Sequence, residues 1–425
     1  MYEKKRIFIG TKPNRPMKKS LLSPLLLLCV LLLAGCTGRP YSLRGDSVTV
    51  RIEDPAPGAA SVLRLQFASP ELVRVSASPD GRMHDRASLV VVPQKKFRDY
   101  RVSLQEGVVC VQTGALTVLV DPKDGALRFL DAAGEELLGG SRMGFEPTEV
   151  EGKAAFSTRV SFDSPEDEAF YGLGQHQSGE LNHKGRSEEL FQYNTKVSLP
   201  MVVSTRGYGL LFDAYSYSRW GNPEGFKPLG EIFKLYDKNG VEGALTGTYK
   251  TRDGKTLVRR EENLYFENER AIRNLPDIPL SGAKVVYEGW IEPRETGEHY
   301  FTQYYAGFQQ TEINGEEVMS RRWRPAWNPN SYRYSMSLFE GLRYPVRIEW
   351  EPDGDVSYLG LRCAPVQSDE MQIKLCFSSE FEPMLDFYFI AGGSYDGTIR
   401  GYRQLTGAAP LIPKWALGFW QSRER

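Results

Sequence analysis

Apolar and polar residues alternate along most of the chain between residues 45 and 236. Residues 47–52 and 71–76 place an apolar side chain at every second position, and dipeptides such as Asp80-Gly81 separate runs of this kind. A period of two with short turns is typical of antiparallel strands that bury one face. We therefore predict a mainly β fold whose N-terminal domain, residues 45–236, is one large β-sandwich.

A second β-rich block follows this domain. Residues 246–274 are rich in charge and weakly patterned, but strand-like runs then resume. Within them, Asn314-Gly315 is the preferred dipeptide of a two-residue hairpin turn. We expect an inserted second β-sandwich over residues 237–368, after which residues 369–392 supply return strands that complete the first sandwich.

The sequence then predicts a single helix. Asp396 is placed to cap its first turn, and Gly407 suits a left-handed stop. Ile399, Tyr402 and Leu405 recur at helical spacing and form its apolar stripe.

Residues 415–420 form a nearly continuous apolar run. Strands that are apolar on both faces belong to parallel sheets and barrels and not to a half-exposed sandwich. A lone parallel strand has no neighbour for its backbone hydrogen bonds. We therefore interpret residues 393–425 as a linker helix and the first strand of a truncated barrel.

The N-terminus has the pattern of an export signal. A basic stretch precedes an apolar run at residues 21–33, which is too short to span a bilayer but fits the core of a signal peptide. The run ends in Ala34-Gly35-Cys36, which resembles the lipobox of bacterial lipoproteins. We expect residues 1–36 to be a lipoprotein signal peptide with Cys36 as the lipid-attachment site. The protein would then be exported and anchored to a membrane, in the periplasm or at the cell surface.

Composition and charge narrow the functional classes. The chain has 425 residues with 53 Lys and Arg against 54 Asp and Glu, so it has no excess positive charge to displace counterions from a nucleic acid. We expect no nucleic-acid partner. Cys110, Cys363 and Cys376 lie far apart in apolar runs and predict buried thiols. We predict no metal site, including at His176 and His183, and no cofactor.

Two clusters of polar residues need an interpretation. The acidic cluster Asp163, Glu166, Asp167 and Glu168 is interpreted as a solvated loop. An aromatic and arginine cluster in the inserted block has two interpretations, the binding of a branched glycan or the packing of a hairpin. Its members are Trp323, Trp327, Tyr332 and Tyr334, with Arg321, Arg322, Arg324 and Arg333.

Several motifs, taken together, resemble glycoside hydrolase family 31. Two of them are similar to the approach to that family's catalytic barrel, and three are similar to its N-terminal sandwich. The resemblance covers about residues 45–235 and 371–425. The two motifs that resemble the approach to the barrel are residues 401–407 and 413–425. The three motifs that resemble the sandwich are residues 170–175, 193–196 and 207–210.

The inserted block resembles the carbohydrate-associated β-sandwich named after anthrax protective antigen. Residues 297–301 and 344–350 accompany the Asn314-Gly315 turn in this resemblance. Calcium-binding members carry an acidic pair before that turn, whereas residues 304–310 contain no carboxylate, so we expect no calcium site. The arrangement is similar to that of bacterial α-xylosidases acting on xyloglucan, in which the insert extends the substrate cleft.

The resemblance to family 31 implies retaining hydrolysis of an α-glycosidic bond on a (β/α)8 barrel. One Asp would be the nucleophile and a second carboxyl group the acid/base, about 5 Å apart. In the family both lie at the carboxyl ends of later barrel strands. We therefore expect both beyond Arg425, and we expect the 425-residue chain to be inactive by itself.

Four residues are candidates for sugar contacts on the strength of this resemblance. Trp420 would stack on a sugar ring or pack in the barrel core, and Asn194 would be a ligand or a turn residue. Arg423 would donate hydrogen bonds to hydroxyl groups. Many family members have an aromatic residue where this chain has Glu424, so the subsite differs in shape. Arg423 and Glu424 equally suit an exposed ion pair.

The leading hypothesis is therefore the N-terminal part of a lipid-anchored α-xylosidase that acts on xyloglucan-like oligosaccharides or polysaccharides. An alternative from another class is a non-catalytic surface glycan-binding lipoprotein in which both sandwiches bind sugar. A third is a scaffold without a ligand of its own.

Overall fold

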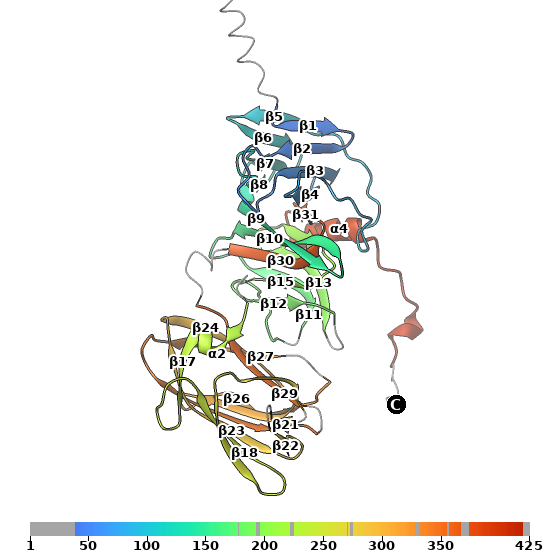
Figure 1. The fold of residues 1–425 in the computed structure, drawn as a ribbon. Helices are drawn as coiled ribbons and strands as arrows, with labels where there is room; N and C mark the ends of the chain where they lie inside the picture. The colour runs from blue at the N-terminus through green and yellow to red at the C-terminus, as the bar shows by residue number, and fades with distance from the viewer. Residues whose placement is uncertain are drawn as a thin grey trace, which may run out of the picture. The chain divides into compact units, whose positions relative to one another are not determined.

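The computed structural model is dominated by strands (Figure 1), which confirms the prediction of a mainly β fold. Two pairs of sheets form two β-sandwiches, which we call the first sandwich and the inserted sandwich. The described residues are 39–176, 178–192, 196–221, 225–269, 271–272, 275–327, 331–354, 357–366 and 374–419.

The first sandwich consists of two antiparallel sheets that enclose one apolar core. The strand order of its first sheet is β1 (Tyr41–Arg44), β2 (Ser47–Arg51), β3 (Val62–Ser69), β4 (Leu72–Ser78), β31 (Leu385–Ile390), β14 (Gly209–Phe212), β13 (Val197–Ser204) and β11 (Phe170–Gln175). The order of its second sheet is β12 (Glu188–Leu190), β15 (Ser218–Trp220), β30 (Lys374–Glu382), β10 (Lys153–Asp163), β9 (Glu136–Val150), β8 (Leu127–Leu130), β7 (Thr117–Val120), β6 (Val108–Gln112) and β5 (Arg101–Gln105).

The return strands β30 and β31 occupy interior positions of these two sheets. β31 lies between β4 and β14, and β30 lies between β10 and β15. Stacked rings connect the two sheets at these strands, since Phe377 lies on Phe212 with centroids 3.8 Å apart and Phe389 lies on Phe129 at 4.1 Å. Such pairs contribute about 0.5–1.5 kcal/mol each beyond the area they bury. The first sandwich is therefore incomplete until residues 374–390 join it.

The inserted sandwich has a core of its own. The strand order of its first sheet is β16 (Lys227–Pro228), β29 (Ser357–Cys363), β24 (Gly297–Tyr305) and β27 (Tyr332–Leu338), with β20 (Tyr265–Glu269) also paired to β29. The order of its second sheet is β19 (Thr256–Glu261), β18 (Leu245–Lys250), β23 (Lys284–Pro293), β28 (Tyr344–Glu351), β25 (Gly307–Ile313) and β26 (Glu316–Arg324), with β17 (Phe233–Asp237) also paired to β23. A short hairpin of β21 (Ala271–Ile272) and β22 (Leu275–Pro279) and the helical turn α2 (Leu229–Ile232) complete it.

Strand pairing places the start of the inserted sandwich before the expected residue 237. β16 and β17 pair with β29 and β23, and Phe233 is buried in the core of the inserted sandwich. Residues 246–274, expected to be weakly patterned, contain β18, β19 and β20. The alternation in β19 was hidden because charged Glu261 faces inward, where Tyr249 donates a hydrogen bond to it at 2.7 Å.

The Asn314-Gly315 turn joins β25 to β26, as predicted. Both residues have positive φ angles, 55° and 76°. Two successive positive φ values are the signature of a type I′ turn, which matches the twist of the two strands.

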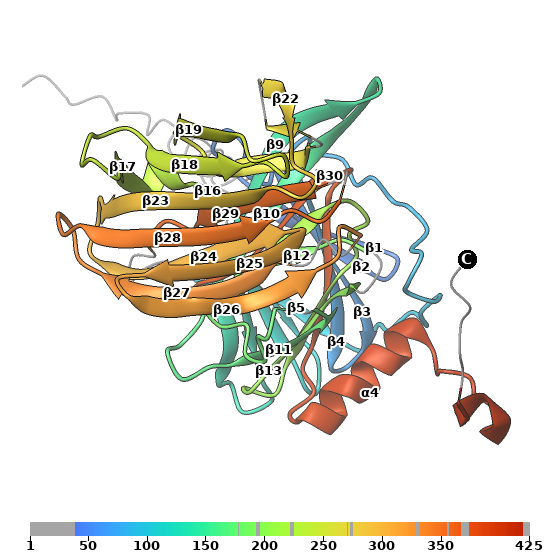
Figure 2. The same cartoon turned by 90° about the horizontal axis from the view of Figure 1, so that it is seen from below.

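Helix α4 (Tyr395–Thr406) packs on the first sheet of the first sandwich (Figure 2). Leu405 is fully buried there, whereas Ile399, expected in the same apolar stripe, is exposed. Ser394 and not Asp396 caps the helix, because its hydroxyl accepts a hydrogen bond from a first-turn amide at 3.1 Å. Gly407, with a φ angle of 84°, follows the last turn as predicted.

The prediction of a strand at residues 415–420 is wrong for residues 415–419, the part that the structure describes. Residues Lys414–Leu417 form the short 3₁₀ helix η1, and Trp415, Leu417 and Phe419 are exposed. A strand needs a neighbour for its backbone hydrogen bonds. The sheets of the described chain supply none to this segment.

The acidic cluster is only partly the solvated loop that we expected. Three of its members are exposed, but Glu168 is buried. Ser164 and Tyr208 donate hydrogen bonds to the Glu168 carboxylate at 2.6 Å each, and Ser204 donates a third. Glu168 therefore holds its loop against the first sandwich.

The cysteine predictions are confirmed. Cys110, Cys363 and Cys376 are buried and free. Burial raises the pKa of the Cys376 thiol to about 11, so this thiol stays protonated at neutral pH.

A buried ion pair connects β31 to β4. Arg74 Nε donates a hydrogen bond to Asp386 Oδ1 at 2.9 Å, and Ser76 donates to the same oxygen at 3.3 Å. The Asp386 side chain is 1% exposed and that of Arg74 is 18% exposed. Removal of one partner from such a pair leaves the other charge buried without compensation.

We predict that Asp386→Ala lowers the free energy of unfolding by about 3–5 kcal/mol, because the Arg74 guanidinium loses its partner. Urea denaturation followed by circular dichroism measures this loss. Glu136→Ala is the matched control, since it breaks the exposed Glu136–Arg128 pair and costs less than about 1 kcal/mol. Equal losses in the two variants would contradict the assignment.

A second ion-pair network connects the first strands of the inserted sandwich. Glu292 on β23 lies 2.8 Å from Lys234 Nζ on β17, and Tyr236 donates a hydrogen bond to its other oxygen at 2.9 Å. Arg343 Nε donates to that second oxygen at 3.3 Å. The hydrogen bond from Lys234, followed by those from Tyr236 and Arg343, lowers the pKa of Glu292 from 4.5 to about 2.

Because of this lowered pKa, the stability of the inserted sandwich changes with pH in the acid range. A carboxyl group whose pKa is lower in the folded state than in the unfolded state stabilises the fold at pH values above its unfolded-state pKa. This stabilisation is lost as the pH falls through the folded-state pKa. We predict that Glu292→Gln is less stable than the wild type at neutral pH and that the difference narrows between about pH 4.5 and pH 2. Urea midpoints across this range measure it, and a difference that stays constant would refute the assigned role.

Candidate functional site

The residues that the sequence singled out for function lie outside the part of the chain that the structure describes. They are Cys36, Asn194, Trp420, Arg423 and Glu424. Within the described residues, no helix is long and apolar enough to cross a membrane.

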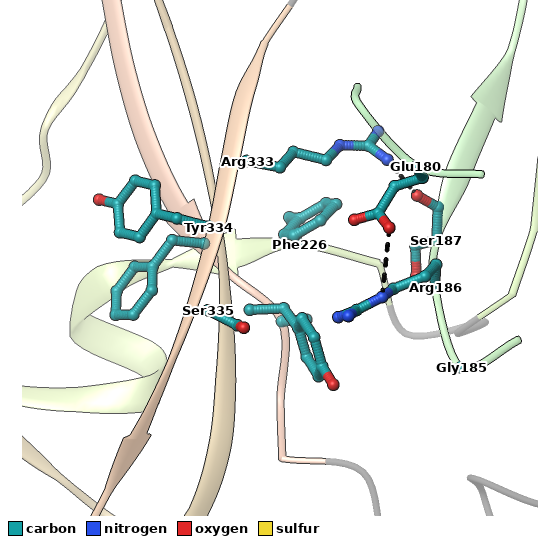
Figure 3. Close-up of a pocket in the computed structure, with 11 residues that line it drawn as sticks. Glu180, Gly185, Arg186, Ser187, Phe226, Arg333, Tyr334 and Ser335 are labelled. Atoms are coloured by element: carbon teal, nitrogen blue, oxygen red, sulfur yellow. Dashed lines mark hydrogen bonds and ion pairs between the residues drawn. The ribbon is translucent and has the colours of Figure 1, made fainter. Parts of the chain in front are cut away.

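A small pocket lies where loops of the first sandwich meet strands β24 and β27 of the inserted sandwich (Figure 3). We call it the junction pocket. Its cavity volume is about 80 Å³. The side chains that carry its chemistry are Glu180 and Arg186 from the first sandwich, Phe226 from the connection between the two sandwiches, and Tyr300, Arg333 and Ser335 from the inserted sandwich.

Strand geometry places three of these side chains. β24 and β27 are antiparallel neighbours in which Tyr300 lies directly opposite Ser335. Paired residues point to the same face, and residues two apart on one strand do the same. Arg333 and Ser335 therefore point to one face of β27. Tyr334 between them also lines the pocket and stacks on Phe301, with centroids 5.1 Å apart.

A buried carboxylate connects the two sandwiches beside the pocket. Glu188 on β12 accepts a hydrogen bond from Arg333 Nη1 at 3.1 Å, although the two residues are 145 positions apart. His176 Nδ1 lies 3.3 Å from the same carboxylate and Lys196 Nζ lies 3.9 Å from it. The Glu188 side chain is 2% exposed, and burial lowers the pKa of Lys196.

The second arginine of the pocket is also paired. Arg186 Nε lies 3.4 Å from Glu180, and the Arg186 guanidinium lies over the Tyr300 ring at 4.6 Å. The Arg333 guanidinium lies 5.7 Å from the centre of the Phe226 ring. In Figure 3, Phe226 lies between Tyr334 on one side and the side chains of Arg333 and Arg186 on the other. Each guanidinium thus has one carboxylate and one aromatic ring as partners.

The groups that line the pocket suit the binding of a polar molecule. Glu180 is the single carboxylate among the described residues that line the pocket. Retaining glycosidases need two carboxyl groups about 5–5.5 Å apart on either side of the reacting bond. The pocket instead offers N–H donors, one carboxylate acceptor and ring faces.

The described residues contain no group of three or more His, Cys, Asp or Glu side chains that would hold a metal ion. His176 Nε2 lies 2.7 Å from the carbonyl oxygen of Leu173, and its other nitrogen faces Glu188. His183 is buried, and burial lowers its pKa. Both histidines serve the packing of this loop.

The sequence cluster contains two residues of the junction pocket, Arg333 and Tyr334, and the other pocket residues were missed. Arg333 belongs to the aromatic and arginine cluster, but the structure divides that cluster. Tyr332 and Tyr334 pack against the core of the inserted sandwich, whereas Trp323 and Trp327 are exposed. Glu180, Arg186 and Tyr300 carry no local signal, because their proximity depends on how the two sandwiches meet.

Close contact between β11 and β13 explains the motif at residues 170–175. Gly172 has a φ angle of 129°, and a Cβ there would lie 2.4 Å from the carbonyl oxygen of Met201. Gly174 has a φ angle of 97°, and a Cβ there would lie 2.1 Å from the carbonyl oxygen of Val197. Side chains would prevent this pairing, so the glycines fix where β11 ends and its following loop begins.

Comparisons with known proteins agree with this fold. Residues 62–220 match the glycosyl hydrolase 31 N-terminal galactose mutarotase-like domain. The crystal structure of a family 31 α-xylosidase from Xanthomonas citri has a TM-score of 0.83 to this chain at 38% identity, and the match covers 90% of this chain and 42% of that one.

Two curated relatives extend the comparison. The α-xylosidase of Saccharolobus solfataricus is 22% identical over 373 residues, which is 85% of this chain and 30% of that protein. An uncharacterized family 31 glucosidase of Pseudescherichia vulneris is 41% identical over 68 residues, which is 16% of this chain and 11% of that protein. The chain thus spans less than half the length of the proteins that it resembles. The matched domain, the relatives and the solved structure thus all show similarity of this chain to the N-terminal part of glycoside hydrolase family 31 proteins.

Proposed function

We propose that this chain is the N-terminal part of a retaining α-xylosidase that removes α-linked xylose from xyloglucan oligosaccharides. The observation that carries the proposal is the 38% identity to the Xanthomonas citri α-xylosidase over 90% of this chain. A match of that extent has to include the inserted sandwich, so both sandwiches and their connection resemble those of an α-xylosidase.

The proposal assigns the chemistry to a barrel beyond Arg425. The nucleophile and the acid/base would stand about 5 Å apart at the carboxyl ends of barrel strands. The exposed apolar side chains of Leu411, Leu417 and Phe419 support a covering domain, because the described chain leaves these large apolar groups in solvent. The relatives' greater length supports it as well.

Within this proposal, Trp420 and Arg423 contact the sugar where the chain approaches the barrel. Glu424 shapes the same subsite, and Asn194 approaches it from the first sandwich. The inserted sandwich corresponds to a protective-antigen-like domain that extends the substrate cleft. Its primed hairpin turn at Asn314-Gly315 supports that correspondence.

We also propose that the protein is exported and carried on a membrane by a lipid on Cys36. The apolar run at residues 21–33 and the small residues before Cys36 support this. Incorporation of radiolabelled palmitate, lost in Cys36→Ser, is the corresponding measurement.

A second candidate function is non-catalytic glycan binding at the surface of the inserted sandwich. Trp323 on β26 is 51% exposed and lies directly opposite Phe308 on β25. Arg321 lies over the Phe308 ring at 4.1 Å. Exposed rings beside a guanidinium suit the C–H faces and hydroxyl groups of a sugar.

We predict that the protein encoded by the full reading frame releases xylose from p-nitrophenyl α-xyloside and that the 425-residue chain releases none. Trp420→Ala in the longer protein lowers kcat/KM about tenfold, equivalent to about 1.4 kcal/mol, because a stacking surface is lost. Trp323→Ala is the matched control and leaves kcat/KM unchanged. Xylose release by the 425-residue chain would disprove the proposal. A reading frame without further coding sequence, together with glycan binding that Trp323→Ala abolishes, would favour the second function.

A further inference from the structure

We propose that the junction pocket is a binding site for one neutral sugar ring, presented by the end of an oligosaccharide. The inference goes beyond the proposed activity, because it concerns residues of the two sandwiches and holds whether or not a barrel follows. It rests on the pocket's size, an unused donor, its charge balance and its ring faces.

The size limits the ligand to a small group. The cavity volume of about 80 Å³ exceeds what one water molecule needs but is far below the about 300–1,000 Å³ of pockets that enclose drug-sized ligands. The site therefore accommodates part of a single ring, with the remainder of the ligand in solvent. Arg186 and Glu180, whose side chains are 32% and 24% exposed, keep this opening accessible.

One hydrogen-bond donor of a residue that lines the pocket has no partner among the described residues. The Arg333 side chain is 10% exposed, and its Nε has no hydrogen-bond partner among the described residues. Buried donors without a partner are rare in folded proteins because each costs about 1–3 kcal/mol. The N–H group is inaccessible to solvent, so a ligand oxygen would accept from it, and remove that cost, after a shift of the Arg333 side chain toward the cavity.

The charge balance favours a neutral ligand. Arg333 is paired with Glu188 at 3.1 Å and Arg186 is paired with Glu180 at 3.4 Å. A carboxylate already compensates each positive charge, so an anion would find no unpaired cation among these residues. The Glu180 carboxylate would also repel it. A hydroxyl group suits this environment, because it accepts from an N–H donor and donates to a carboxylate.

The aromatic rings favour a sugar over other neutral polar molecules. Phe226 and Tyr300 both line the pocket. Sugar rings have C–H faces that pack on aromatic side chains and hydroxyl groups at their edges that reach flanking polar groups. The junction pocket combines these two kinds of surface within one small cavity.

Binding at this place would also stabilise the contact between the sandwiches. Glu180 and Arg186 belong to the first sandwich, while Tyr300 and Arg333 belong to the inserted sandwich. A ligand that contacts both stabilises only the arrangement in which they meet. We therefore expect sugar to raise the unfolding temperature of the chain.

The test measures binding of D-xylose, D-glucose and glucuronate to the purified 425-residue chain by isothermal titration calorimetry, with ligand-observed NMR for weak binding. Ser335→Trp fills the pocket from an exposed position on β27. Ser337→Trp is the matched control, because Ser337 is also exposed, lies two residues further on the same strand and does not line the pocket. We expect D-xylose or D-glucose to bind with a millimolar Kd, weakened about tenfold or more by Ser335→Trp and unchanged by Ser337→Trp.

Three results would overturn the proposal. They are the absence of saturable binding by either neutral sugar, equal binding by Ser335→Trp and the wild type, and binding of glucuronate that is stronger than that of both neutral sugars. Tyr300→Leu provides a second test if Ser335→Trp does not fold, and it should weaken binding by removal of one ring face. Circular dichroism verifies the fold of each variant. The xylose-release assay is independent of this experiment, so each proposal can fail alone.

Discussion

Both sheets of the first sandwich depend on strands that the chain supplies only after the inserted sandwich. β30 and β31 lie inside their sheets, where each pairs with a neighbour on both sides. Without them each sheet would be divided in two, and the rings of Phe212 and Phe129 would lose their stacking partners. The inserted sandwich is therefore held by the chain at both of its ends. Its strands β24 and β27 share the junction pocket with the loop that precedes β12.

Glu188 is the charge on which that contact is built. It lies on an edge strand of the first sandwich, yet its side chain is 2% exposed because Arg333 of the inserted sandwich covers it. Arg333 at 3.1 Å and Lys196 at 3.9 Å compensate the negative charge of this carboxylate, and His176 Nδ1 lies 3.3 Å from it. The same pairing holds Arg333 at the wall of the junction pocket.

The sequence predicted the features that depend on local pattern and missed those that depend on long-range contacts. Strand alternation, the primed turn at Asn314-Gly315 and the stop at Gly407 are local, and the structure contains them. The burial of Glu168 follows from hydroxyl donors, such as that of Tyr208, that are distant in sequence. The run at residues 415–420 was apolar enough for a buried strand, but a strand forms only where a neighbour is present. For the site, Arg333 was visible in an unusual cluster, whereas its partners had no pattern of their own.

Hydrogen exchange of the folded chain tests the central constraint most directly. If β31 is an interior strand of the first sandwich, its amides open with the same free energy as those of β4 and β14, because all three belong to one cooperative unit. Mass spectrometry of peptides from the exchanged chain resolves these strands separately. The account predicts coincident opening of β4, β14 and β31, and Asp386→Ala should accelerate all three together. Exchange of β31 that is faster than that of β4, or that changes alone in the variant, would contradict it.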